Sequence, residues 1–134
     1  PDNRYYDALK KWYKERHNFE VQNEWVVNTP GVCFALSTAV KAFTNEGESV
    51  LIQKPVYYPF FNIINSLQRK VVNSSIILKN NHYEIDFDDF ERKIVQENVK
   101  MFILCSPHNP GGRVWTKQEL QKISEIQRNF RRKS

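Results

Sequence analysis

Two short runs of apolar residues constrain the fold of this chain more than any other feature of its sequence. Residues 50–52 read Val-Leu-Ile and residues 101–104 read Met-Phe-Ile-Leu. Successive side chains of a β-strand point to opposite faces, so a strand without polar residues has to be covered on both faces. Strands of this kind are typical of parallel sheets that carry a layer of helices on each side. The two runs therefore predict an α/β fold.

Five other segments place apolar residues at helical spacing. These segments cover residues 6–13, 34–43, 60–67, 87–94 and 120–126. Asp86 with Asp89 is expected to begin the fourth helix, and Thr116 with Glu119 forms a capping box that begins the last. The remaining elements expected are strands at residues 25–27 and 70–77 and a turn at residues 80–81. Strands thus alternate with helices, which predicts three layers, with a mostly parallel sheet and helices on both faces.

Length and composition fit one domain or part of a larger one, because the chain has 134 residues of which 40% are hydrophobic. The net charge is +5, and one basic cluster lies near the end of the chain. The cluster consists of Arg128, Arg131, Arg132 and Lys133. A solvated helix end is favoured over a nucleic-acid surface, because the other charges are mixed along the helix faces. No apolar run approaches the length of a membrane span. Neither nucleic acid nor a membrane is therefore an expected partner.

The two cysteines, Cys33 and Cys105, stand among apolar neighbours. Their separation fits no zinc-binding or redox motif, so no metal site is predicted. They are expected to be buried, reduced thiols of a cytoplasmic protein.

Three features follow predicted strands, at the edge where open α/β sheets bind ligands. In residues 29–33, Thr-Pro-Gly-Val-Cys, a turn runs directly into a helix. The backbone N–H groups at a helix start suit a phosphate, although most such junctions bind nothing. In the second feature Tyr57 lies between Pro55 and Pro59. Its ring either stacks on a flat heterocycle or covers the edge of the sheet.

The third feature, residues 106–112, is the most specific of the three. Asn109 stands between Pro107 and Pro110, and Gly111 and Gly112 follow. A rigid turn of this composition would hold an amide side chain out at the end of a strand. Such an amide can donate a hydrogen bond to a phenolate oxygen.

Residues 105–115, Cys-Ser-Pro-His-Asn-Pro-Gly-Gly-Arg-Val-Trp, resemble the Ser-Pro-x-Asn-Pro-Thr-Gly segment of fold-type I aminotransferases, which use pyridoxal 5'-phosphate (PLP). The Arg-Val-Trp-Thr of residues 113–116 is typical of the cystathionine β-lyase-like carbon–sulfur lyases of that superfamily, and residues 29–32 and 47–61 look like the same subgroup. One departure is Gly111, which stands where the common motif has Thr. The resemblance implies an incomplete PLP-transferase large domain. Residues 1–134 would be its N-terminal part, with residues 127–134 departing from the family.

The resemblance also implies roles for five residues. Gly31, Val32 and Cys33 would present backbone N–H groups to the PLP phosphate. Tyr57 would stack on the pyridine ring, and Asn109 would hydrogen-bond the oxygen of the ring's 3-hydroxyl group. The bond between Asn109 and Pro110 is expected to be cis, as in relatives. The implied substrate is an amino acid, and the implied assembly is a homodimer.

Other functional groups of the family have no match here. The Schiff-base lysine, the aspartate that pairs with the pyridine nitrogen and the arginine for the substrate carboxylate are expected after residue 134. No lysine of this chain stands in a matching context, so no catalytic residue is assigned. Two hypotheses stay open. The chain is part of a PLP-dependent aminotransferase or carbon–sulfur lyase, or it is an inactive remnant or interaction module with an α/β scaffold.

The resemblance also raises a question about strand order. In relatives, later strands are expected to separate the strand ending at Thr29 from the strand ending at Cys105, and the latter from the strand ending at Gln53. Without those later strands the sheet would have gaps and unpaired backbone edges. We therefore expect the strands to pair in another order, or the chain to associate with a second copy.

Overall fold

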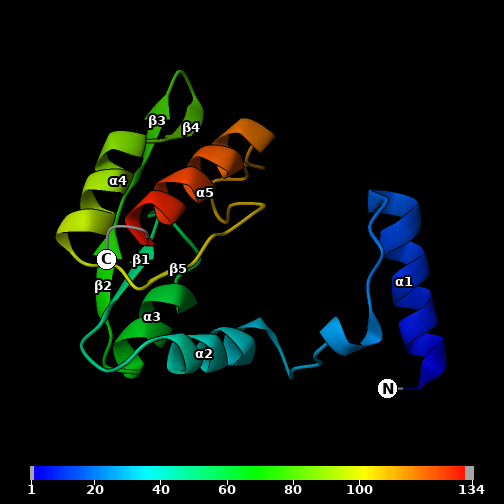
Figure 1. The fold of residues 1–134 in the computed structure, drawn as a ribbon. Coiled ribbons are helices and arrows are strands. Elements are labelled where there is room, and N and C mark those ends of the chain that lie inside the picture. Colours follow the sequence, from blue (N-terminus) through cyan, green and yellow to red (C-terminus); the bar gives the residue numbers. More distant parts are fainter. Residues whose placement is uncertain (1, 132–134) are drawn as a thin grey trace. The chain divides into compact units, whose positions relative to one another are not determined.

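The computed structural model describes residues 2–131, and these form two compact units that divide between Pro30 and Gly31. The first unit contains helix α1 (Asn3–His17) and a short 3-10 helix (Asn23–Trp25) (Figure 1). Asp2 caps α1 by accepting a hydrogen bond from the backbone N–H of Tyr5, and α1 ends at Asn18 in a left-handed conformation. The strand predicted at residues 25–27 is wrong, because the backbone there leaves the 3-10 helix without forming a ladder with any strand of the described residues.

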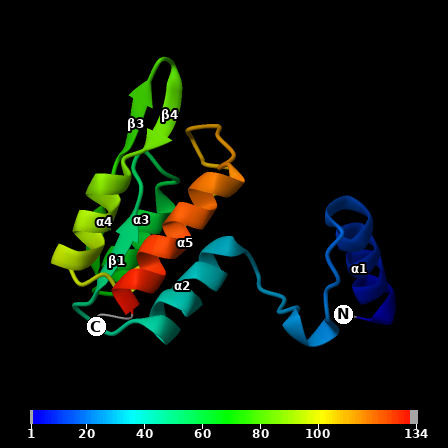
Figure 2. The same cartoon turned by 45° about the horizontal axis from the view of Figure 1, so that its top comes forward.

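The second unit is built on a sheet of three parallel strands in the order β2–β1–β5. The strands are β1 (Ser49–Ile52), β2 (Lys70–Asn73) and β5 (Met101–Phe102). Four helices accompany them: α2 (Val32–Phe43), α3 (Pro59–Ser66), α4 (Phe87–Gln96) and α5 (Lys117–Arg131). Figures 1 and 2 show α2 beside α3 and α4 beside α5. The predicted α/β class, with a parallel sheet and helices, is confirmed.

Each face of the sheet closes on its own apolar cluster, because side chains alternate along β1. Val50 and Ile52 belong to one cluster and Leu51 to the other. The α2–α3 cluster comprises Val40, Val50, Ile52, Phe60, Ile63, Ile64 and Ile103. The α4–α5 cluster comprises Leu51, Val72, Ile76, Ile85, Phe90, Ile94, Val99, Trp115, Ile123 and Ile126. Helices therefore cover both faces, as the wholly apolar strand predicted.

Strand β1 pairs directly with β5, which corrects the expected strand order. Val50 lies opposite Met101 and Leu51 opposite Phe102. The ladder extends past β5, since the N–H of Ile103 donates to the Leu51 carbonyl at 3.0 Å. The backbone groups of the two strands satisfy each other, so no gap separates them. The gap expected between these two strands is therefore absent, and association with a second copy stays a prediction.

The strand predicted at residues 70–77 is two strands that belong to different sheets. Strand β2 ends at Asn73, and β3 (Ile76–Lys79) pairs antiparallel with β4 (His82–Ile85), a strand that sequence patterning missed. The predicted turn between β3 and β4 is confirmed, because Asn80 and Asn81 have positive φ angles of 49° and 61°.

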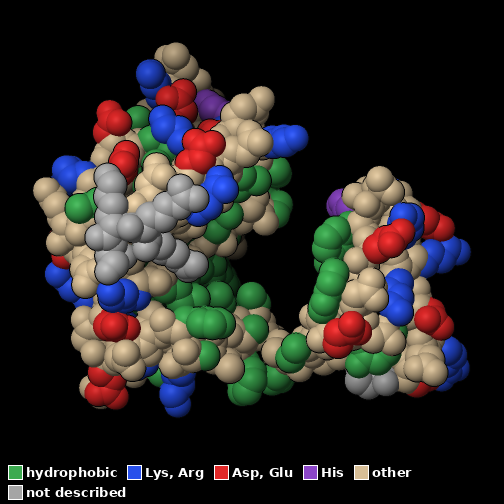
Figure 3. Space-filling model, in the orientation of Figure 1, with side chains coloured by type: hydrophobic (Ala, Val, Ile, Leu, Met, Phe, Trp, Pro, Cys, Tyr) green, Lys and Arg blue, Asp and Glu red, His purple; other side chains and the backbone are tan. Residues whose placement is uncertain are grey.

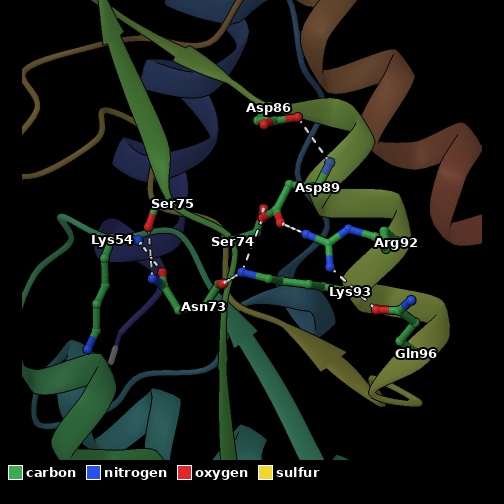
Figure 4. A network of polar contacts seen from close by, with 9 residues as sticks. All are labelled: Lys54, Asn73, Ser74, Ser75, Asp86, Asp89, Arg92, Lys93 and Gln96. Atoms are coloured by element: carbon green, nitrogen blue, oxygen red, sulfur yellow. Dashed lines mark hydrogen bonds and ion pairs between the residues drawn. The ribbon is translucent and has the colours of Figure 1, made fainter.

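A polar network holds the break between β2 and β3 against α4 (Figure 4). The Ser74 hydroxyl, which is fully buried, donates to Asp89 Oδ2 at 2.8 Å, and Lys93 Nζ lies 3.3 Å from the same oxygen. Lys93 also donates to the Asn73 carbonyl. These bonds satisfy buried polar groups where the chain leaves one sheet for the next.

The two predicted helix starts are confirmed. Asp86 accepts a hydrogen bond from the N–H of Asp89 at 3.0 Å. Thr116 and Glu119 form a reciprocal capping box, in which the Thr116 N–H donates to Glu119 Oε2 at 2.8 Å and the Glu119 N–H donates to Thr116 Oγ1 at 3.3 Å. Of the predicted basic cluster, Arg132 and Lys133 lie outside the described residues.

Candidate functional site

Gly31, the first of the predicted site residues, is the N-cap of helix α2. Gly31 has φ 147° and ψ 166°, a combination that is essentially restricted to glycine. The first hydrogen bond of the helix runs from the Ala35 N–H to the Gly31 carbonyl at 3.2 Å. The N–H groups of the first turn have no intrahelical acceptor, and glycine brings no side chain to cap them. They point out of the helix at its positive end, which suits an anion such as a phosphate.

Val32 and Cys33 differ in their surroundings. Val32 is 62% exposed, whereas the Cys33 side chain is partly buried against the α2–α3 cluster. Figure 3 shows hydrophobic side chains gathered over α2, and Phe34 and Phe43 are among the exposed ones. Cys33 and Cys105 are both free thiols, but they are partly rather than fully buried.

Tyr57 lies in the loop that leaves β1 and enters α3. Its ring is partly buried and meets the edge of the Phe60 ring, with centroids 6.0 Å apart and planes at 84°. Phe60 is itself buried in the α2–α3 cluster, so its contact holds the Tyr57 ring against that cluster. The neighbouring Tyr58 is 73% exposed. The sequence motif thus places one of its two tyrosines against the core and leaves the other in solvent.

Two side chains from other segments hold the Tyr57 loop. The Lys54 N–H donates to Asn73 Oδ1 at 2.9 Å (Figure 4). His108 Nε2 lies 2.7 Å from the Pro55 carbonyl oxygen. A carbonyl oxygen only accepts, so the imidazole donates from Nε2.

Asn109 lies in the loop that follows β5, and the predicted cis bond between Asn109 and Pro110 is confirmed. The Asn109 N–H donates to Cys105 Sγ at 3.4 Å. Its side chain is exposed, and no other residue of the described range 2–131 forms a hydrogen bond with its amide group. The loop closes on itself where the His108 N–H donates to the Arg113 carbonyl and the Gly112 N–H to the His108 carbonyl, each at 2.6 Å.

A group of buried and partly buried side chains that sequence reasoning did not assign to the site supports the Asn109 loop. Trp115 is 3% exposed, and its Nε1–H donates to the Cys105 carbonyl at 2.8 Å. The Arg113 guanidinium lies 4.6 Å above the Trp115 ring and donates to both carboxylate oxygens of Glu119 at 2.7 and 2.8 Å. The sequence did show the Arg-Val-Trp stretch after the motif, but there it indicated resemblance to a subgroup and did not predict these contacts.

Glu119 has a pKa below the ordinary glutamate value. Partial burial raises its pKa, but hydrogen bonds from the Thr116 N–H, from Arg113 and from the Thr116 hydroxyl together lower it by more. The carboxylate therefore remains ionised and keeps both the capping box and its pair with Arg113.

The predicted site residues converge on one apolar cluster. Cys33 and Tyr57 both pack against the α2–α3 cluster, and so does Cys105, whose sulfur accepts from the Asn109 N–H. The Tyr57 loop follows the carboxyl end of β1, and the Asn109 loop follows that of β5. Neither Tyr57 nor Asn109 lines the hollow of about 630 Å³ next to the Tyr57 loop, whose lining includes Lys54, Tyr58 and Phe61.

Two kinds of site are not found among residues 2–131. No group of three or more His, Cys, Asp or Glu side chains there is arranged to hold a metal ion. No helix of this described range is both long enough and apolar enough to cross a membrane.

Comparison with known proteins gives consistent matches. The family model described as "Aminotransferase class I and II" matches residues 2–131. "Cystathionine beta-lyase PatB" of Bacillus subtilis (strain 168) is 41% identical over 126 residues, which are 94% of this chain and 33% of that protein. "Protein MalY" of Escherichia coli (strain K12) is 29% identical over 119 residues, which are 89% of this chain and 30% of that protein.

Solved structures give the same result. Cystalysin from Treponema denticola, whose crystal structure contains a pyridoxal 5'-phosphate cofactor, has a TM-score of 0.91 and 44% identity over 96% of this chain and 33% of that chain. The PLP-bound C–S lyase from Staphylococcus hominis has a TM-score of 0.91 and 34% identity over 97% of this chain and 34% of that chain. The chain thus spans about a third of the length of the relatives it matches.

Proposed function

Because the chain belongs to the class I and II aminotransferase family, we propose that it forms part of the PLP-binding region of an enzyme that acts on amino acids. In this proposal residues 1–134 are the N-terminal part of the PLP-binding large domain. The family's cofactor is PLP, which PLP-bound structural neighbours contain. Bound PLP would supply an electron sink for the negative charge that forms at the α-carbon of an amino acid.

The residues present fit PLP in three respects. Gly31 leaves the start of α2 open, so the N–H groups of Val32 and Cys33 can bind the phosphate. Tyr57 offers a ring whose orientation is supported by Phe60, so it can stack on the flat pyridine. The amide of Asn109 is free among the described residues to donate to the 3-oxygen of the pyridine.

The convergence of these three segments on the α2–α3 cluster carries the proposal. They are separated in sequence by 24 to 52 positions, counted from Cys33 to Tyr57 and from Tyr57 to Asn109. An isolated glycine, tyrosine or asparagine would carry little weight. Together they offer an anion site, a stacking ring and an amide donor, which match the phosphate, the pyridine ring and the phenolate oxygen of one molecule.

Carbon–sulfur lysis is the reaction we propose for the enzyme that contains this region. The similarity to PatB and to C–S lyases favours lysis over transamination. Residues 2–131 contribute binding and orientation in this proposal, and none of them is assigned a covalent or proton-transfer role. We further propose a homodimeric, cytoplasmic enzyme that does not act on nucleic acid. Release of a thiol from a cysteine conjugate, compared with amino-group transfer to a keto acid, separates the two reactions.

A PLP titration of the full chain tests the proposed site. Asn109→Ala should weaken PLP binding by about 10-fold or more, because it removes one hydrogen bond to a charged oxygen, worth about 1.5–3 kcal/mol. Tryptophan fluorescence and cofactor absorbance report binding. Asn129→Ala, at an exposed position of α5, is the matched control and should bind PLP like the parent chain. Equal affinity of Asn109→Ala and the control would remove Asn109 from the site.

A further inference from the structure

His108 is the buried member of an exposed loop. It is 2% exposed, whereas Pro107, Asn109 and Pro110 on either side of it lie in solvent. Burying an imidazole costs free energy unless its polar atoms are bound. The proposed PLP site gives this residue no part, so its burial needs another explanation.

The hydrogen bond from His108 to Pro55 joins the two loops of the proposed site. The donor His108 Nε2 and the acceptor oxygen of Pro55 are 2.7 Å apart and come from segments 53 residues apart in sequence. Pro55 lies two residues before Tyr57, and His108 directly precedes Asn109. One hydrogen bond thus connects the backbone near Tyr57, whose ring would stack on PLP, with the side chain of the residue next to Asn109, whose amide would donate to PLP.

The imidazole is held tightly on its remaining sides. Its ring meets the edge of Trp115, with centroids 5.4 Å apart and planes at 71°. A Cβ atom at Gly111 would lie 3.0 Å from His108 Cδ2 and 3.3 Å from Tyr83 Cδ2. A side chain at position 111 would therefore require the His108 ring or the Tyr83 ring to move by a few tenths of an ångström, which favours glycine there.

Only one nitrogen of the ring has a partner in the described part of the chain. His108 Nδ1 is buried and no described group binds it. Within the described residues, the hydrogen bond from Nε2 to the Pro55 carbonyl is therefore what joins the polar atoms of the His108 ring to the rest of the chain.

We propose that His108 is a positioning residue that locks the Asn109 loop to the Tyr57 loop through its Nε2–H. The lock fixes the amide donor relative to the stacking ring before any ligand arrives, which lowers the entropy lost on binding. The role in ligand binding rests on the proposed PLP site, but the hydrogen bond between the two loops is present in the ligand-free chain.

Three variants of the full chain separate the hydrogen bond from the packing. His108→Phe keeps an aromatic ring against Trp115 and removes the donor. His108→Gln keeps an amide N–H near the position of Nε2 and removes the ring. His82→Phe, at an exposed position of β4, is the matched histidine control. Circular dichroism and urea unfolding establish that each variant is folded.

The first readout is NMR of the ligand-free chain. The side-chain Nε2–H of His108 should exchange slowly with solvent, because it is buried and donates to the Pro55 carbonyl. In His108→Phe the resonances of both Tyr57 and Asn109 should shift, while His108→Gln should leave both near their original positions. Shifts confined to one of the two loops, or a rapidly exchanging Nε2–H, would overturn the lock.

The second readout is PLP affinity. His108→Phe should bind PLP about 5- to 10-fold more weakly, as expected for the loss of one neutral hydrogen bond. His108→Gln should recover to within about 2-fold of the parent, which a purely structural role of the ring would not produce. An unchanged affinity of His108→Phe, or equal losses in Phe and Gln variants, would contradict the positioning role.

The two proposals fail in different ways. If the parent chain does not bind PLP, the proposed function falls, and the NMR readout alone decides whether His108 locks the loops. If the parent binds PLP and Asn109→Ala weakens binding while His108→Phe does not, the proposed site stands and the positioning role is rejected.

Discussion

Each face of the sheet is covered by two helices and an apolar cluster, but the residues that border the two clusters differ. The α4–α5 cluster is bordered by contacts that stabilise the fold, namely the Asp86 N-cap of α4, the capping box of α5 and the Ser74–Asp89 hydrogen bond. The α2–α3 cluster is bordered by Cys33, Tyr57 and Cys105, which belong to or contact all three proposed PLP-binding segments. Substitutions in the α4–α5 cluster are therefore expected to change mainly stability, and those in the α2–α3 cluster are expected to affect the proposed site as well. A substitution on each face should therefore change different measurable quantities.

Trp115 is the residue that joins the two faces. Its side chain belongs to the α4–α5 cluster, yet its Nε1–H binds the Cys105 carbonyl on the other side. The Asn109 loop lies between these two contacts in the sequence. Trp115 therefore links the Asn109 loop to the α4–α5 cluster, in addition to the α2–α3 cluster against which Cys105 packs.

The largest effect is expected from Phe90→Ala, in the middle of the α4–α5 cluster. Phe90 is fully buried and meets the edge of the Phe102 ring at 5.0 Å. Loss of the ring should lower the free energy of unfolding by about 3–5 kcal/mol, measured by urea denaturation. Phe61→Ala, where the ring is 40% exposed, should cost clearly less. The PLP affinity of the folded fraction should stay near that of the parent, and a specific loss of affinity would show that the two faces are not separable.

Gly31→Ala is expected to have a smaller effect, which should appear both in the free energy of unfolding and in PLP affinity. The φ of 147° is strained for alanine, so the free energy of unfolding should fall by about 1–3 kcal/mol. No atom lies within 4 Å of the added Cβ, so the cost comes from the backbone and not from crowding. The strained start of α2 should also weaken binding of PLP and of inorganic phosphate. Unchanged phosphate binding would indicate that the start of α2 is not the anion site.

The smallest effect is expected from acid, acting on Glu119 at the start of α5. The pKa of Glu119 is lowered in the folded chain from its ordinary value of 4.5, so its ionised form stabilises the fold above that pH. This contribution should be lost as the pH falls below about 4.5 and through the folded pKa. Urea denaturation from pH 7 to pH 3 should show a smaller acid-induced loss in Glu119→Gln than in the parent. Identical pH profiles would show that the pair with Arg113 contributes nothing measurable to stability.

The fold class followed from sequence patterns that each have a local physical cause. Residues 50–52 are apolar because β1 is covered on both faces, and that requirement predicted the parallel sheet. The capping pair Thr116 and Glu119 acts within one helical turn, so spacing alone was enough to find it. The three candidate segments were also legible, because glycine, proline and asparagine at strand ends have restricted conformational uses.

The strand order and the break after Asn73 needed the tertiary structure. Residues 70–77 are rich in β-branched side chains, and nothing in that run shows that Ser74 turns inward to reach Asp89, fifteen residues later. Direct pairing of β1 with β5 is likewise a contact between distant segments, and the resemblance suggested the wrong neighbour. Local propensity cannot decide which strand lies beside which, because the deciding hydrogen bonds join residues far apart in the chain.

The sequence by itself determined the α/β class and the helix starts, which depend on neighbours a few positions away. The residues proposed to bind PLP were identified from the resemblance of their motifs to the family. The tertiary structure alone decided that Cys33, Tyr57 and Cys105 share one cluster and that His108 reaches Pro55. It also gave a reason for Gly111, because a side chain there would meet the imidazole. Such requirements arise only when distant segments are packed together, and no spacing in the sequence encodes them.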